Sequence, residues 1–251
     1  MTVEYVEPQE HTADAPSPIL AAAAARVEFL ASPDRLIYAA LKRGFDVALS
    51  LAVLGVLGPV WLFIALLIKL SSRGSVLYRA RGVGRHGQPF IYYKFRTMVA
   101  GNDDSTHREW IANYVNADQP FAVRPNGNGQ VEPIYKVVKD GRVTWLGRYL
   151  RWFGLDEVPQ FINVLRGEMS AIGPRVPLEY EYAHYDDFAR QRLTVLPGIT
   201  GLAQVRARGT ASFSEMLKSD LEYIQRRSLW LDVCIALRTI PVMLLGRGHT
   251  G

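Results

Sequence analysis

The stretch that decides the fold is Leu155-Asp-Glu-Val-Pro-Gln-Phe-Ile-Asn-Val-Leu-Arg166. It places two adjacent carboxylates, Asp156 and Glu157, before apolar residues that recur at three- and four-residue spacing, which is the pattern of a helix. Asp is a preferred N-cap residue, and a proline such as Pro159 is tolerated in a first helical turn. We therefore expect Asp156 to face unpaired amide groups at a helix N-terminus and to stay ionised at neutral pH.

Basic residues flank the two carboxylates on both sides. Arg148 and Arg151 precede them, and Arg166 and Arg175 follow. An anionic nucleophile among cations at a helix N-terminus suits chemistry on phosphates. The structural alternative is that Asp-Glu only caps the helix, and these two residues taken alone favour that alternative.

The surrounding motifs are longer and more specific than the carboxylate pair. The chain continues with Asn163-Val-Leu-Arg-Gly-Glu-Met-Ser-Ala-Ile-Gly-Pro-Arg175, and it also contains Tyr93-Lys-Phe-Arg-Thr-Met98 and Leu196-Pro-Gly-Ile-Thr-Gly201. Together these segments resemble the bacterial sugar transferases, the monotopic polyprenyl-phosphate phosphoglycosyl transferases of the type that initiates exopolysaccharide synthesis. Gly58, Gly154 and Val176 stand where that family usually has Ser, Ser or Thr, and Pro.

The resemblance implies both a fold and an activity. The fold expected is α+β and mainly helical, with a re-entrant membrane helix and a small cytosolic catalytic domain that has a short β-hairpin and amphipathic interface helices. The activity implied is transfer of a hexose-1-phosphate from a UDP-sugar to polyprenyl (undecaprenyl) phosphate. UMP would be released through a phosphoaspartyl-sugar intermediate, at the cytoplasmic face of the inner membrane, to initiate exopolysaccharide or glycan synthesis.

The resemblance also suggests roles for individual residues. Asp156 is the expected nucleophile, and Glu157 positions the acceptor or leaving group or relays protons. Mg²⁺ is the expected cofactor, because a hard divalent ion with few protein ligands neutralises a diphosphate, and Asp156 is its expected ligand. Phosphate oxygens would be held by five cations: Lys94, Arg96, Arg151, Arg175 and Arg206.

Composition limits the partners but does not choose among them. The 251 residues carry a net charge of +5, and the pI near 9.3 favours nucleic acid, anionic lipid headgroups or phosphorylated substrates. The motifs favour the phosphorylated substrates and a membrane over nucleic acid. Self-association and contacts with downstream glycosyltransferases stay open. The rival function is a non-catalytic, membrane-tethered basic protein that binds polyanions or scaffolds a polysaccharide complex.

One apolar segment indicates a membrane anchor. Residues 47–68 contain no charge, and 22 helical residues would reach roughly 33 Å, enough to cross a bilayer. Gly58-Pro59 lies in the middle, where proline breaks a helix, and basic residues flank both ends. These features favour a re-entrant hairpin broken at Gly58 and Pro59 over a single span, with a soluble core helix as the third alternative.

The rest of the chain divides into predicted regions. We expect a disordered tail over 1–34, the re-entrant hairpin over 35–72 and the catalytic domain over 73–251. In the catalytic domain, Gly82, Gly84 and Gly87 match a dinucleotide-binding spacing but lead into an aromatic strand, so a glycine-rich hairpin is the better interpretation.

Three further segments carry expectations that the structure can test. Residues 120–133 are interpreted as a surface loop. Residues 178–194 are interpreted as one charged helix whose acids face solvent. Residues 213–245 are expected to form two helices, and the second is expected to lie on the core or on a membrane interface.

Overall fold

The computed structural model describes residues 33–99, 105–125, 131–135, 141–207 and 210–244. The predicted tail therefore lies outside the described residues, apart from its last two positions. The chain forms two compact units, Met1–Leu41 and Lys42–Gly251, and the elements discussed below belong to the second unit except for the first turns of helix α2. The domain boundaries proposed from the sequence stay predictions.

The predicted anchor is a bent pair of helices. Helix α2 (Pro33–Leu51) runs into a π-helical turn, η1 (Ala52–Val56), and α3 (Gly58–Ser71) then starts in a new direction. The bend between the two helices is 63°. Pro59 sits in the first turn of α3, where its missing N–H costs no intrahelical bond. The chain thus bends where the sequence predicts it.

This bend favours the broken helix that the sequence predicts over a single straight helix for the apolar segment. Within the part of the chain that the structure describes, no single helix has the length and hydropathy to cross a membrane, whereas the bent pair taken together does. The indole of Trp61 donates to the carbonyl oxygen of Val53 at 2.7 Å across the bend. That bond links the π-helical turn to the first turns of α3.

Helix α3 has one buried and one exposed apolar face. Ile64 and Ile68 pack against Phe95, Leu150 and Val158, which belong to the elements that carry the candidate site. The rest of the helix surface exposes large apolar side chains: Val60, Leu62, Phe63, Leu66 and Leu70. A contiguous exposed apolar surface of this kind is typical of a lipid or protein contact.

Two cations that the sequence assigned to membrane topology also have packing roles. Lys42 pairs with Asp46 at 2.9 Å and lies 3.7 Å from Asp232. Arg43 donates to the carbonyl oxygens of Val164 and Leu165, at 2.5 and 2.8 Å. Positive charge near the last carbonyls of a helix is favourable. These contacts hold α2 against helix α6 (Gln160–Arg166) and helix α11 (Leu229–Leu244).

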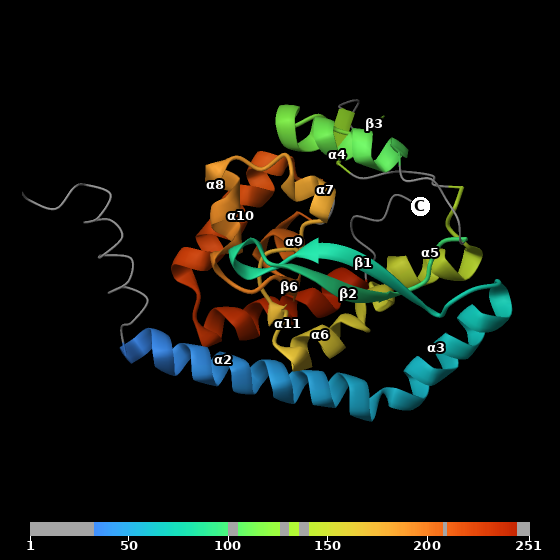
Figure 1. Cartoon of the computed structure of the whole chain (residues 1–251), viewed down its shortest axis with the longest axis horizontal. Helices are drawn as coiled ribbons and strands as arrows, with labels where there is room; N and C mark the ends of the chain where they lie inside the picture. Colours follow the sequence, from blue (N-terminus) through green and yellow to red (C-terminus); the bar gives the residue numbers. More distant parts are fainter. Residues whose placement is uncertain (1–32, 100–104, 126–130, 136–140, 208–209, 245–251) are drawn as a thin grey trace, which may run out of the picture. The chain divides into compact units, whose positions relative to one another are not determined.

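The glycine-rich segment is a β-hairpin, as predicted. Strands β1 (Leu77–Val83) and β2 (Pro89–Phe95) pair antiparallel, with Ala80 opposite Tyr92. The short turn η2 (Arg85–Gly87) joins them, and Gly87 has φ 78°, a conformation that favours glycine. Figure 1 shows the hairpin in teal between α7 (Glu179–Tyr182) and α6, and β1 contacts α7 while β2 contacts α6.

Two of the expectations from sequence are wrong. Residues 120–133 include two paired strands, β3 (Ala122–Pro125) and β4 (Val131–Ile134), which follow helix α4 (Ser105–Ala117). The region 178–194 is not one helix, because α7 is followed by α8 (Asp187–Arg190) and a 3-10 turn, η4 (Gln191–Thr194). Asp186 starts α8 by accepting the amide of Ala189 at 2.7 Å, which gives the chain a new helix start.

The remaining elements complete the catalytic unit. Strands β5 (Ser170–Ile172) and β6 (Gly198–Thr200) pair in parallel. Helices α5 (Trp145–Trp152), α9 (Leu202–Arg206), α10 (Phe213–Arg226) and α11 make the chain mainly helical. The expected fold class, mainly helical with a small β-hairpin, is confirmed, whereas membrane association stays a prediction. Helix α11 buries Asp232 and Ile235 and exposes the apolar side chains of Trp230, Leu237 and Leu244.

Candidate active site

The two carboxylates lie on a short turn that begins at a glycine. Helix α5 ends at Trp152, and Gly154 takes a left-handed conformation, φ 66° and ψ 16°, with its amide donating to the Arg151 carbonyl at 3.1 Å. Glycine adopts this conformation without steric cost. The chain then reverses into the 3-10 turn η3 (Leu155–Glu157), which carries Asp156 and Glu157.

Asp156 is not the N-cap that the sequence predicts. Helix α6 starts at Gln160, with Pro159 in the N-cap position and no side-chain cap. Asp156 is 8% exposed, and burial raises its pKa from 3.8 to about 6, with Glu157 adding to the rise and Lys94 and Arg151 opposing it. Desolvation outweighs the nearby cations, yet a pKa of about 6 still leaves the carboxylate mostly ionised at neutral pH, as expected.

Lys94 connects strand β2 to the turn. Its ammonium group lies 2.6 Å from a carboxylate oxygen of Glu157. Burial alone would lower the pKa of Lys94, but the negative charges of Glu157 and Asp156 outweigh burial and raise it. Lys94 is therefore a permanent cation beside both carboxylates.

Tyr92 stands between this group and Arg175. Its ring is 4% exposed and lies 5.8 Å from the Lys94 ammonium. Burial raises the pKa of Tyr92, whereas Lys94 and Arg175 both act to lower it. The two cations therefore border the same buried phenol, and Lys94 is shared with the Asp156–Glu157 pair.

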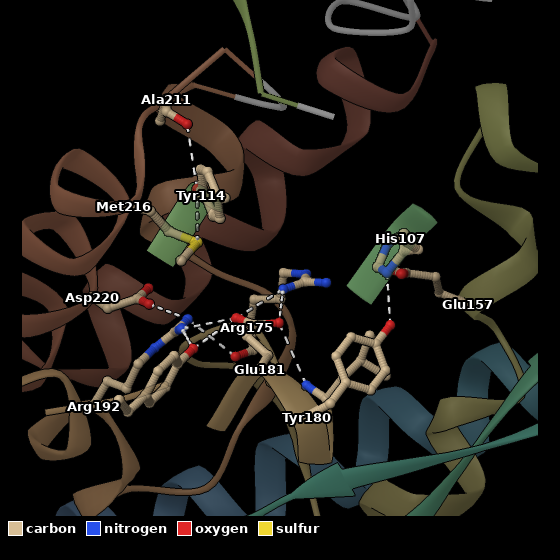
Figure 2. Close-up of polar contacts among 12 residues, drawn as sticks. His107, Tyr114, Glu157, Arg175, Tyr180, Glu181, Arg192, Ala211, Met216 and Asp220 are labelled. Atoms are coloured by element: carbon tan, nitrogen blue, oxygen red, sulfur yellow. Dashed lines mark hydrogen bonds and ion pairs between the residues drawn. The ribbon is translucent and has the colours of Figure 1, made fainter. Parts of the chain in front are cut away.

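Arg175 is anchored on one side and exposed on the other. Its Nη1 atom lies 3.1 Å from a carboxylate oxygen of Glu181, and the Arg175 side chain is 41% exposed. The Glu181 carboxylate raises the pKa of Arg175 against the effect of burial. Figure 2 shows Glu181 within a set of polar contacts that also contains Arg192 and Asp220.

Two other predicted phosphate ligands have structural partners. Arg151 donates from Nε to the Thr97 hydroxyl at 2.8 Å. Arg96, which is 9% exposed, donates to the carbonyl oxygens of Ile68, Ser72 and Arg73 at the end of α3, at 2.7 to 3.3 Å. It therefore caps the C-terminus of α3. A phosphate-binding role for either residue stays a prediction.

The contacts of Arg206 lie on other elements. It forms an ion pair with Glu222 of α10, and Glu222 also pairs with Arg226 at 2.7 Å. These residues line a cavity of about 310 Å³ together with Trp230, Cys234 and Arg238 of α11. Among the described residues, Arg206 contacts Glu222 and neither of the two carboxylates, so its assignment to the phosphate site stays a prediction.

The residues present fit a Mg²⁺ ion only if the substrate contributes ligands. Among the described residues, no group of three or more His, Cys, Asp or Glu side chains is placed to hold a metal ion. Mg²⁺ is often held by one or two carboxylates together with phosphate oxygens and waters. Asp156 and Glu157 provide such a pair at a site suited to a diphosphate.

Sequence reasoning missed the residues that hold Arg175. Glu181 was expected on a solvated face, yet it has no exposed surface, and Arg192 and Asp220 are equally buried. Three ionisable residues spaced over 40 positions give no local signal. The Glu181 carboxylate accepts the Leu178 amide at 3.5 Å, but Leu178 has no polar side chain, so no capping-box pattern in the sequence marks Glu181.

Comparison with known proteins agrees with this geometry. The sequence profile described as "Bacterial sugar transferase" matches residues 37–246. The chain is 38% identical over 207 residues to the exopolysaccharide production protein ExoY of Rhizobium meliloti, which covers 82% of this chain and 87% of that protein.

Two other relatives have names that state a reaction. A UDP-glucose:undecaprenyl-phosphate glucose-1-phosphate transferase of Caulobacter vibrioides is 36% identical over 81% of this chain and 69% of its own length. An undecaprenyl-phosphate galactose phosphotransferase of Salmonella typhimurium is 34% identical over 81% of this chain and 40% of its own length. The extent of these matches, together with the paired carboxylates beside Lys94, shows that the chain belongs to the bacterial sugar transferase family.

Proposed function

We propose that this protein transfers a sugar-1-phosphate from a UDP-sugar to polyprenyl phosphate and releases UMP, with Asp156 as the nucleophile. The observation that carries the proposal is the buried Asp156 carboxylate beside Glu157 and Lys94, in a chain of this family. The names of the Caulobacter and Salmonella relatives support undecaprenyl phosphate as the acceptor and glucose or galactose as the sugar.

The first step forms a covalent intermediate. A carboxylate oxygen of Asp156 attacks the phosphorus that carries the sugar, and the bond from that phosphorus to the bridging diphosphate oxygen breaks. UMP leaves with that oxygen and its electron pair. A pKa of about 6 suits the step, because the group is mostly ionised at pH 7 and is more basic than an ordinary aspartate.

The second step transfers the sugar phosphate to the lipid. An oxygen of polyprenyl phosphate attacks the same phosphorus, and the bond to the Asp156 oxygen breaks. The products are the diphosphate-linked sugar and the free carboxylate. Charge develops on the phosphoryl oxygens in such transfers, so Lys94 and Arg175 contribute by holding those oxygens.

Glu157 and the metal ion complete the proposed site. Glu157 holds the Lys94 ammonium at 2.6 Å and thus fixes the cation next to the nucleophile. A Mg²⁺ ion held by Asp156 and Glu157 together with the donor diphosphate would supply charge neutralisation.

The bent helices serve as a membrane anchor in this proposal. A break after Leu57 and an exposed apolar face on α3 would let α2 and α3 enter the bilayer and return to its cytoplasmic side. The nucleophile, close to the buried face of α3 through Val158, would then lie at headgroup depth.

Intact-mass analysis after rapid quenching tests the covalent step. The chain is mixed with donor alone, and a sugar-phosphate mass is expected on the peptide that contains Asp156, with about one equivalent of UMP released. Asp156→Asn should show neither, whereas Asp232→Asn, a buried carboxylate on α11, should show both. Product formation from donor and acceptor without any adduct on the polypeptide would refute Asp156 as the nucleophile.

Thiol labelling tests the anchor. Leu36→Cys and Arg73→Cys, each in a Cys234→Ser background, place a thiol on either side of the bend. A membrane-impermeant reagent should modify both from the cytoplasmic side of oriented vesicles. Labelling from opposite sides would show a spanning segment instead.

A further inference from the structure

The Arg175 guanidinium is bound by the carboxylate of Glu181, which has no exposed surface. Glu181 accepts from Nη1 of Arg175 at 3.1 and 3.5 Å and from the Tyr185 hydroxyl at 2.7 Å. The pKa of Glu181 is lowered, because Arg175, Arg192 and the Tyr185 hydroxyl together outweigh the effect of burial. Glu181 is therefore a fixed negative charge in direct contact with the Arg175 guanidinium (Figure 2).

The main chain of Arg175 is held as well. Arg192, which is fully buried, donates to the Arg175 carbonyl oxygen at 3.1 Å, to the Tyr185 hydroxyl at 2.5 Å and to Asp220 at 2.5 Å. Both the backbone and one edge of the guanidinium are thus tied to buried groups. A long side chain that is ordered before the substrate binds loses less conformational entropy on binding.

The other edge of the guanidinium has no protein partner among the described residues. In the stretches that the structure describes, Nη1 is the guanidinium atom of Arg175 that has a protein partner, and the side chain remains 41% exposed. Nε and Nη2 therefore stay available as a fork of donors, the arrangement that binds phosphate oxygens in bidentate fashion. Arg175 and Lys94 both act on the buried Tyr92 phenol, and Lys94 also acts on Asp156, so the two cations belong to the same region of the molecule.

We propose that Glu181 is a positioning residue, which fixes the Arg175 guanidinium so that its outer edge binds a phosphate group of the substrate at Asp156. This inference rests on the proposed function for the identity of the substrate. The alternative is that Glu181 only stabilises the fold by pairing buried arginines. The two roles differ in one respect: a positioning residue acts on catalysis through Arg175 alone.

A double-mutant cycle separates the two roles. Glu181→Gln should lower kcat/KM for UMP release by about 10²-fold per folded molecule, because misplacing a phosphate ligand is costly. In an Arg175→Ala background the same change should cost less than about twofold, since Arg175 is already absent. An equal loss in both backgrounds would overturn the inference.

A matched variant controls for destabilisation. Asp232 is also fully buried and accepts from a tyrosine hydroxyl, that of Tyr223, at 2.7 Å. Asp232→Asn should lower Tm much as Glu181→Gln does, yet leave kcat/KM per folded molecule unchanged. A comparable loss of activity in Asp232→Asn would show that damage to any buried carboxylate produces the effect.

Binding of inorganic pyrophosphate gives a readout that does not depend on turnover. Glu181→Gln and Arg175→Ala should each weaken its Kd, measured by calorimetry, by about tenfold or more, whereas Asp232→Asn should not. If the wild-type chain releases no UMP from any UDP-sugar but shows this binding pattern, the proposed function fails and the role of Glu181 stands. Unchanged pyrophosphate affinity in Glu181→Gln, or no binding to the wild-type chain, would overturn the inference.

Discussion

Asp156 and Glu181 are both buried carboxylates near cations, but their pKa values shift in opposite directions. The pKa of Asp156 rises to about 6, whereas that of Glu181 falls. Glu181 accepts hydrogen bonds from Arg175 and Tyr185 and lies 3.8 Å from Arg192. Asp156 has nearby cations, but no side chain among the described residues donates a hydrogen bond to it.

The difference shows that hydrogen-bond donors, and not burial alone, decide the direction of the pKa shift. Asp220 supports this interpretation, because it pairs with Arg192 alone and burial raises its pKa. Asp156 has no side-chain donor among the described residues and keeps a raised pKa, and perturbed groups of this kind are common at catalytic sites.

Removing the Asp156 charge should have the largest effect: it should lower turnover and raise the stability of the fold. Asp156→Asn should lower turnover by about 10⁴-fold or more, because a nucleophile is lost. It should also raise the free energy of unfolding at pH 7, by up to about 3 kcal/mol for a pKa of about 6 against an ordinary 3.8. UMP release and thermal unfolding measure the two effects.

The pH dependence identifies the source of that stabilisation. The folded state holds the Asp156 proton up to about pH 6, whereas the unfolded chain releases it near 3.8, so wild-type stability falls as pH rises through this window. The Tm difference between Asp156→Asn and wild type should therefore grow from pH 4 to pH 6 and then level off. A difference that is constant with pH would show that the carboxylate is not desolvated as described.

Removing the positive charge of Lys94 should lower activity less than removing the Asp156 carboxylate does. Lys94→Met should lower kcat/KM by about 10²-fold, because a phosphate ligand is lost. Since Lys94 lowers the pKa of Asp156, its loss should raise that pKa further. Activity requires the ionised carboxylate, so the acid limb of the pH–rate profile should move to higher pH. Lys218→Met, at an exposed position on α10, serves as the control and should leave the limb in place.

The features of the fold that the sequence predicts are those set by local chemistry. Pro59 breaks the helix because it lacks an amide hydrogen, and the bend appears at that point. The hairpin follows from the glycine-rich turn at Gly87, which leads into a strand of aromatic residues. The signature around Asp156 identified the family because it is long and nearly continuous, and the family match confirms that interpretation.

The features that the sequence does not predict depend on contacts between distant residues. Arg96 follows a strand and resembles a surface cation, yet it caps α3 through carbonyls more than 20 positions away. Glu181 was assigned to solvent because its neighbours are charged, whereas its partner Arg192 lies in a separate turn. The rise in the Asp156 pKa was not predicted for the same reason: desolvation comes from the packing of η3 against β2 and α5, which helix-capping rules do not include.

The smallest expected effect comes from Glu157, and it tests whether charge alone sets the pKa of Asp156. Glu157→Gln keeps the size of the side chain and removes a negative charge that raises that pKa, so the acid limb should move to lower pH. Lys94 also loses its partner at 2.6 Å and becomes free to approach Asp156, which acts in the same direction. In the pH–rate profile, the rate on the high-pH plateau reports any separate role of Glu157 with the acceptor or leaving group. The position of the acid limb reports only the ionisation of Asp156. Movement of the limb to higher pH would mean that Glu157 positions a donor for Asp156, and Asp156 would then resemble Glu181 more closely than the structure indicates.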